Sequence, residues 1–185
     1  MEIIGKRVML RDFKRSDLDD HLRWRESETE WMNWDSPWRE NNRIDAYEYA
    51  ERRIASLRTK TDSDIRWTFE ICTYPERVHI GWSNCYCLDL FYNYSKKQTR
   101  RYALGIDIVP MEYRGQGLGG EAFELFQSYL LEFGIFRYYT QTWIGNTRME
   151  NMAKRLGYKA VNVKKNKFSH NGKRYDIVTF CLEVS

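Results

Sequence analysis

The sequence lacks any apolar run that approaches the roughly 20 residues of a membrane span. It also lacks internal repeats and any stretch with the composition of an interdomain linker. The first ten residues have the pattern of a strand or hairpin and not that of a signal peptide. With 185 residues the chain is long enough for one substantial core. A single domain over residues 1–185 and a cytoplasmic location are therefore expected.

Cysteine and histidine are sparse, and neither is spaced as a set of metal ligands. The four cysteines are dispersed, without a C-x-x-C pair: Cys72, Cys85, Cys87 and Cys181. The three histidines are likewise scattered: His21, His79 and His170. These patterns predict reduced, mostly buried cysteines and no bound metal.

Charge of one sign is not in large excess, because the net charge is only +4. That value is too modest to predict a nucleic-acid partner by itself. Between Lys154 and Arg174 there are eight Lys or Arg residues and no Asp or Glu. A second basic cluster, Lys96–Arg101, has the composition of a solvated hairpin tip. Solvated basic surface is the favoured interpretation of both, and no membrane or nucleic-acid partner is expected. An RNA or DNA patch is the alternative interpretation for residues 154–174.

The most informative segment that is present runs from Ile106 to Gly120 and has the pattern of a strand, a glycine-rich turn and a helix start. Gly115, Gly117 and Gly119 alternate directly after Arg114. Missing side chains let successive backbone N–H groups converge at a helix N-terminus, where the helix dipole favours negative charge. The segment therefore predicts a binding site for a phosphate or pyrophosphate.

Two common phosphate-binding motifs are excluded by the residues on the C-terminal side of these glycines. A dinucleotide fingerprint needs an acidic residue about 20 positions further on, and residues 135–140 contain none. A nucleotide-triphosphate P-loop ends in Gly-Lys-Ser/Thr, whereas this turn ends in Gly-Gly-Glu121. The remaining pattern is Arg114-Gly-Gln-Gly117-Leu-Gly119.

A second motif lies downstream. Asn146 suits a helix N-cap, apolar residues come after it at helical spacing, and Gly157 suits the left-handed position after the helix end. Tyr158 is the next residue. Either motif alone would be weak, but together they identify one family.

The two motifs resemble those of the GNAT superfamily of N-acetyltransferases, and the outer sequence features are similar to its RimJ/RimL-like branch. The predicted order βααβββαβαββ matches the fold of that family: an α/β (α+β) domain with a mixed, mostly antiparallel twisted sheet flanked by helices. The predicted strands are Val8–Arg11, Arg66–Thr73, Val78–Cys87, Tyr102–Val109, Tyr138–Trp143, Tyr158–Val163 and Tyr175–Glu183. Four helices are predicted. The first begins at Asp17 after an N-cap at Ser16, and the second has an apolar face of Ile44, Tyr47, Ile54 and Leu57. The third spans Glu121–Phe133, and the fourth begins at Asn146.

The resemblance implies acetyl-CoA as co-substrate, with no metal. It implies that the pantetheine arm pairs with the backbone near Ile108 and Val109, that the loop amides receive the pyrophosphate, and that the basic segment after Lys154 lies near the nucleotide end. The implied cofactor-binding residues are Ile108, Val109, Arg114, Gly115, Gln116, Gly117, Leu118, Gly119, Gly120 and Asn146.

The acid and base are less well defined. The positions where many family members carry a Tyr or a Ser proton donor are Ala153 and Met149 here. Tyr138, Tyr139 and Tyr158 are chemically competent substitutes, although such residues usually pack in the core. Asp107 and Glu70, in predicted strands near the cleft, are the candidate bases; Glu112 also precedes the loop.

Four tryptophans crowd between Trp24 and Trp38 with interleaved carboxylates. Aromatic faces and carboxylates suit a cationic amine, so Trp31 and Trp34 are the candidate acceptor-binding residues. The alternative is that these rings pack the helices or a homodimer interface. The predicted activity is direct acetyl transfer to a primary amine, on a small molecule or on a peptide or protein N-terminus. The alternative is a catalytically silent coenzyme A-binding module for regulation or assembly.

Overall fold

The computed structural model describes residues 1–38, 46–61 and 63–184. Its internal contacts divide the chain into two compact units, one of residues 1–83 and 106–125, the other of residues 84–105 and 126–185. Strands β4 (His79–Leu88) and β6 (Tyr102–Ile108) contribute residues to both units. The prediction of one domain over residues 1–185 stays a prediction.

The first unit, which we call the acidic unit because its carboxylates outnumber its cations, opens with the antiparallel strands β1 (Glu2–Ile4), β2 (Val8–Arg11) and β3 (Thr68–Thr73). Its helices are α1 (Asp17–Glu26), α2 (Met32–Asp35) and α3 (Ala46–Arg58), with a 3-10 turn η1 (Thr29–Trp31) before α2. A second 3-10 turn, η2 (Met111–Tyr113), leads to α4 (Leu118–Glu132). Strand β2 is completely buried, which makes it a central part of this core.

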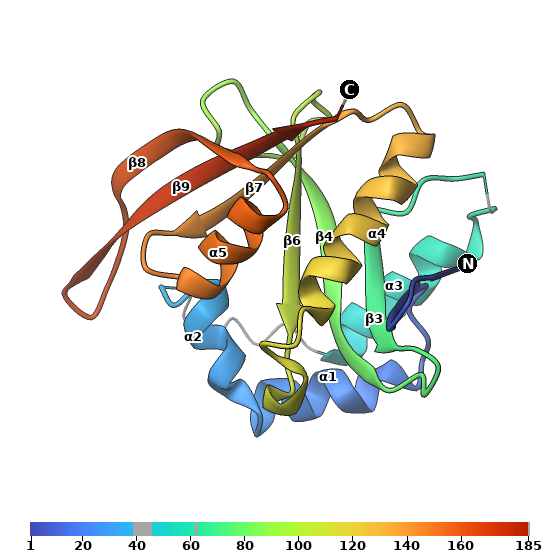
Figure 1. The fold of residues 1–185 in the computed structure, drawn as a ribbon. Helices are drawn as coiled ribbons and strands as arrows, with labels where there is room; N and C mark the ends of the chain where they lie inside the picture. The colour runs from blue at the N-terminus through green and yellow to red at the C-terminus, as the bar shows by residue number, and fades with distance from the viewer. Residues whose placement is uncertain (39–45, 62, 185) are drawn as a thin grey trace. The chain divides into compact units, whose positions relative to one another are not determined.

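The second unit, which we call the basic unit because its cations outnumber its carboxylates, contains the mixed part of the sheet. Strand β6 pairs parallel with β7 (Arg137–Trp143), and β7 pairs antiparallel with β9 (Lys173–Glu183). Strand β9 pairs in turn with β8 (Lys159–His170), and the two form the long orange-to-red ribbon of Figure 1. The short strand β5 (Tyr94–Ser95) pairs with β4, and helix α5 (Thr147–Arg155) comes after β7.

The predicted fold class, helices that flank a mixed and mostly antiparallel sheet, is confirmed. The predicted elements occur in the predicted order, which did not include β1, α2 or β5. Strand β8 ends seven residues later than predicted, since backbone pairing with β9 extends it through a polar sequence that has no strand pattern. Helix α4 begins at Leu118 and not at Glu121, so two glycines lie in its first turn. Ile44 lies outside the described residues.

The start of helix α1 corrects one detail. The helix begins at Asp17 as predicted, but the Ser16 side chain makes no capping hydrogen bond. The carboxylate of Asp17 accepts instead from the backbone N–H of Lys14 at 2.7 Å and forms a two-bond pair with Arg11. These bonds fix the turn before the helix, in which the N–H of Asp17 itself donates to the carbonyl of Lys14 at 3.0 Å. None of the described helices combines the length and hydropathy of a membrane span.

Candidate active site

The glycine loop of the acidic unit is open and backbone-lined. Gly115 and Gly117 have φ angles of +73° and +83°, a region in which a β-branched side chain would be strained. A Cβ placed on Gly115 or Gly120 would meet nothing within 4 Å. Because α4 begins at Leu118, its first-turn N–H groups have no acceptor within the helix and lie at the positive end of its dipole. The loop therefore fits a pyrophosphate.

Arg7 lies beside this loop, and the sequence motifs did not point to it. Its Nη1 donates to the carbonyl of Gln116 at 2.9 Å, and its Nη2 would be 3.4 Å from a Cβ on Gly117. Glu121, in the first turn of α4, accepts from the backbone N–H of Arg7 at 2.7 Å and from its Nε at 3.1 Å. Partial burial opposes ionisation of Glu121, but these hydrogen bonds lower its pKa below the usual range. Arg7 is thus a half-exposed cation beside the glycine loop, paired with Glu121.

Arg114 has a different position from the one expected. Its Nε donates to the carbonyl of Ile108 at 2.8 Å, and its other nitrogens contact the carbonyl of Val109 and the carboxylate of Glu30. The guanidinium therefore fixes the end of β6, and its role toward the pyrophosphate stays a prediction. The carbonyls of Ile108 and Val109 already accept hydrogen bonds, although each keeps a second lone pair. The N–H of Val109 donates to Ile80 at 2.9 Å.

Asn146 belongs to the basic unit. It is the N-cap of α5, as predicted, and its side chain accepts from the backbone N–H of Met149 at 3.2 Å. Gly157 has a φ of +84° just beyond the helix, which confirms the predicted C-terminal stop. The role of Asn146 in holding the co-substrate stays a prediction.

Glu70 is the centre of a buried polar cluster in the acidic unit. Its Oε2 lies 3.1 Å from Nε2 of His21 and 3.1 Å from Nε2 of His79, and its Oε1 accepts from Arg53 at 3.2 Å. The side chain of Glu70 is completely buried. Two of the histidines that look scattered in sequence therefore meet at one carboxylate, because α1, β3 and β4 pack together around it.

His79 links Glu70 to the surface. Its Nδ1 lies 2.9 Å from Oδ2 of Asp20, whose side chain is 24% exposed, so the imidazole joins a buried carboxylate to a solvated one. Burial opposes protonation of His79, but Glu70, Asp17 and Asp20 raise its pKa above the usual value. Burial by itself would raise the pKa of Glu70, but hydrogen bonds and charge from the two histidines and Arg53 lower it to about 2.

These pKa shifts bear on the predicted base. A carboxylate with a pKa of about 2 and three donors has little affinity for a proton from an amine. The ligand-type atoms of His21, Glu70 and His79 lie within 4.8 Å of one another, a donor set that could hold a metal ion. In this structure the same atoms are satisfied by one another through hydrogen bonds. Glu70 is thus placed as a structural anion.

Asp107, the other candidate base, lies near the end of β6 and is half-buried. The strand there is close to Gly81, where a Cβ would be 1.9 Å from the carbonyl oxygen of Asp107. Only glycine permits this approach of β4 to β6. Asp107 keeps its place as a proposed base.

The two predicted acceptor tryptophans have different environments. Trp31 is 8% exposed, packs edge-on to Trp82 at 5.1 Å, and donates from Nε1 to the carbonyl of Trp24 at 2.8 Å. It belongs to a core cluster with Val109 and offers little surface to an acceptor. Trp34 is half-buried, and its Nε1 donates to Glu30 at 2.6 Å. Trp34 is therefore the better placed of the two.

The substitute proton donors are packed in the basic unit. The hydroxyl of Tyr138 donates to the carbonyl of Gln127 at 2.9 Å, and Tyr158 accepts from the Gln127 side chain. Burial raises the pKa of Tyr138 to about 12 and raises that of Tyr158 further. Both rings are buried, as expected for core residues. Ala153, in place of the family's Tyr, is also buried.

The fold and the loop define an acetyltransferase. Residues 7–159 match the family model described as the acetyltransferase (GNAT) domain, and the chain belongs to that family. It is an acetyltransferase that uses acetyl-CoA as co-substrate. A search of curated protein sequences finds no match.

Solved structures with low sequence identity share the fold. An acetyltransferase of the GNAT family from Bacillus anthracis has a TM-score of 0.75 and 16% identity, covering 99% of this chain and 98% of that one. RimL, a ribosomal L7/L12 alpha-N-protein acetyltransferase in complex with coenzyme A, has a TM-score of 0.74 and 12% identity over 100% and 98% of the two chains. A ribosomal-protein-S5-alanine acetyltransferase from Vibrio fischeri has a TM-score of 0.75 and 14% identity over 99% and 96%.

Proposed function

We propose that this acetyltransferase acts on an α-amine, carried by a small molecule or by a peptide or protein N-terminus. The observation that carries the proposal is the environment of Glu70, whose pKa of about 2 makes it a poor base. An acceptor that needs a strong base is therefore disfavoured. Two of the similar structures are N-terminal protein or ribosomal-protein alanine acetyltransferases, which agrees with this choice.

The acidity of the amine decides how much help it needs. An α-amino group has a reference pKa of about 7.7–8.0 and a lysine amine one of about 10.4. At pH 7 roughly one α-amine in ten is neutral, but only about one alkyl amine in a few thousand. Asp107, or water, is a sufficient proton acceptor for the first case and not for the second.

The charge of the acidic unit supports a cationic acceptor. Residues 1–83 and 106–125 contain 16 Lys or Arg and 21 Asp or Glu, a net charge of −5. An excess of carboxylates attracts a protonated amine before it loses its proton. The ring of Trp34 lies beside the carboxylate of Glu30, which also pairs with Arg114, so the ring face is the part of this pair that suits an ammonium group.

The residues of the chain act by holding and orienting. Bound acetyl-CoA supplies an activated thioester, whose C–S bond breaks as the amine nitrogen forms its bond to the acetyl carbon. The amides that begin α4 and the cation of Arg7 are suited to hold a pyrophosphate. Asp107 is proposed to receive the amine proton. Placing both substrates together supplies proximity, so direct transfer needs no nucleophile from the chain.

The co-substrate is tested by thermal denaturation. Acetyl-CoA should raise the melting temperature, because a ligand at 100 times its Kd that binds only the native state adds about 2.7 kcal/mol. NAD and ATP should give smaller shifts. Stronger protection by NAD would contradict the assignment of the loop.

The acceptor is tested with an amine panel. Thiol release from acetyl-CoA should be faster with N-terminal peptides than with polyamines at pH 7, and peptides with a blocked N-terminus and a free lysine serve as the matched control. Preferential acetylation of polyamines at neutral pH would overturn the α-amine proposal. Acetyl-CoA binding without turnover of any amine would favour the silent coenzyme A-binding module.

A further inference from the structure

The two units differ strongly in charge. Residues 84–105 and 126–185 contain 14 Lys or Arg and five Asp or Glu, a net charge of +9. The rest of the chain is acidic, so the overall charge of +4 conceals this separation. A unit with such an excess of one sign attracts polyanions.

Both basic segments of the sequence belong to this unit, and the later one contacts the loop that leads into the cluster Lys96–Arg101. The Nζ atoms of Lys164 and Lys167, on β8, both donate to Oδ1 of Asn93, at 2.6 and 3.2 Å. The cluster Lys96–Arg101 continues from the same loop in the chain. Burial and then the neighbouring Lys167 lower the pKa of Lys164, as expected where cations crowd. Positive charge is therefore concentrated around one loop.

The loop also displays large apolar side chains. Leu90, Phe91 and Tyr94 are 73%, 76% and 66% exposed. The carboxylate of Asp89 accepts from the backbone N–H of Phe91 and of Asn93, at 2.8 Å each, and so fixes the loop shape. Exposed rings and cations therefore occur in one loop segment, a combination that suits a partner with both flat apolar faces and negative charge.

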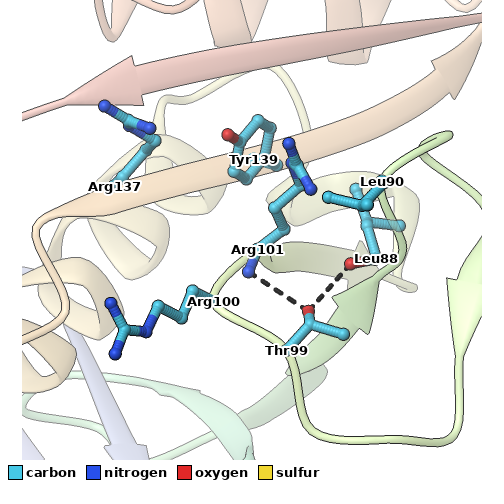
Figure 2. A pocket seen from close by; sticks show the side chains of 7 residues that line it. All are labelled: Leu88, Leu90, Thr99, Arg100, Arg101, Arg137 and Tyr139. Carbon is cyan, nitrogen blue, oxygen red and sulfur yellow. Dashed lines mark hydrogen bonds between the residues drawn. The ribbon is translucent and has the colours of Figure 1, made fainter.

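A pocket adjoins the loop (Figure 2). Its lining combines aliphatic, aromatic and cationic side chains: Leu88, Leu90, Thr99, Arg100, Arg101, Arg137 and Tyr139. In Figure 2 the side chain of Arg101 lies beside Tyr139 and Leu90, and its guanidinium is 5.5 Å from the centre of the Tyr92 ring. Arg137 is paired with Glu183 through side chains that are both more than half exposed, so this pair exchanges readily with another anion.

We propose that the surface formed by residues 90–101 with Lys164 and Lys167, here called the basic loop face, binds single-stranded nucleic acid. The cations contact phosphates, while Phe91 and Tyr94 stack on unpaired bases. A duplex hides the faces of its bases, so it would use the charge of this face and not its exposed rings. This inference does not depend on the proposed amine acceptor.

Binding is measured by fluorescence anisotropy of labelled 20-nucleotide RNA and DNA single strands with the full chain. Affinity should fall with salt, with a slope of log K against log [KCl] of about −3 for roughly four phosphate contacts. A matched duplex should bind more weakly. Equal binding of duplex and single strand, or no binding at low salt, would overturn the proposal. The RNA and DNA arms show which single strand is preferred.

Two sets of variants separate charge from stacking. The double variant Arg100→Gln with Arg101→Gln should weaken binding. The number of phosphate contacts calculated from the salt slope should fall by about two. Phe91→Ala with Tyr94→Ala should weaken single-strand binding about five-fold or more and leave the slope unchanged. If the ring variant bound single strands like wild type, the stacking role would be wrong.

The controls lie on the acidic unit and in the competitors. Arg15→Gln with Arg52→Gln removes two exposed cations of the acidic unit and should leave nucleic-acid binding unchanged. Every variant should keep its thermal protection by acetyl-CoA. Full displacement of the single strand by coenzyme A would contradict a dedicated nucleic-acid site. So would full displacement by polyglutamate, if polyglutamate binding were also weakened by Phe91→Ala with Tyr94→Ala.

Discussion

Nε2 of His79 lies 3.1 Å from Oε2 of Glu70, in the interior of the acidic unit. The carboxylate is completely buried and the imidazole is 6% exposed, so each group loses its water and is compensated by the other. His21 and Arg53 complete the set of donors around the carboxylate. We therefore expect substitutions in this cluster to lower the stability strongly. The two imidazoles also pack against tryptophan rings, His79 against Trp24 and His21 against Trp82.

Glu70→Gln should lower the free energy of unfolding by about 3–5 kcal/mol, because it removes the buried negative charge that the two histidines and Arg53 share. Chemical denaturation measures the change. Glu51→Gln is the matched control, since Glu51 pairs with Arg15 at an exposed position and should cost less than about 1 kcal/mol. An equal decrease in the free energy of unfolding in the two variants would show that the buried cluster contributes no more than an exposed ion pair.

The same cluster predicts how stability depends on pH. The folded pKa of Glu70, about 2, is below its ordinary 4.5, so its contribution is present above pH 4.5 and is lost as the pH falls towards 2. The folded pKa of His79 is raised above 6.5, so its contribution is present below 6.5 and is lost as the pH rises through the folded value. The difference in unfolding free energy between wild type and His79→Gln should be largest between about pH 4.5 and 6.5. A difference that grew above about pH 8 would contradict this assignment.

Gly117→Val should abolish protection by acetyl-CoA while the chain still folds. The φ of +83° strains a β-branched residue by about 1–2 kcal/mol, and the new side chain would approach Arg7 beside the loop. Gly172→Val is a matched control, because its φ of +74° imposes similar strain at the hairpin turn of β8 and β9. The control should lose stability and keep acetyl-CoA binding. Retained affinity in Gly117→Val would show that the loop does not hold the pyrophosphate.

Trp31 and Trp34 should respond differently to truncation. Trp31→Ala removes a buried ring and should cost about 3–5 kcal/mol of stability. Trp34→Ala should raise the KM for the acceptor several-fold, with acetyl-CoA affinity and stability nearly unchanged. Steady-state kinetics with an N-terminal peptide, together with thermal denaturation, separates the two. Wild-type acceptor kinetics in Trp34→Ala would remove this segment from the acceptor site.

Local sequence patterns were sufficient to predict turns and helix ends, because these features depend on residues that are close together in the chain. Alternate glycines predicted the turn before α4, and Asn146 and Gly157 predicted the limits of α5, because capping and positive φ are properties of single backbone positions. The strand Val8–Arg11 and the family assignment came from such patterns. The length of β8 did not, since its hydrogen bonds come from β9.

Packing decided the side-chain roles. The sequence places His21, Glu70 and His79 on three different elements, and only the approach of α1, β3 and β4 brings them together and lowers the pKa of Glu70. Packing also buries Trp31, directs Arg114 to the end of β6, and places Arg7 at the loop. A residue's neighbours across the fold set its solvation and its partners, and these determine whether a carboxylate acts as a base or as a structural anion. The sequence by itself determined the family and the glycine turn, whereas the tertiary structure alone decided which charged groups lie beside that turn and which stabilise the core.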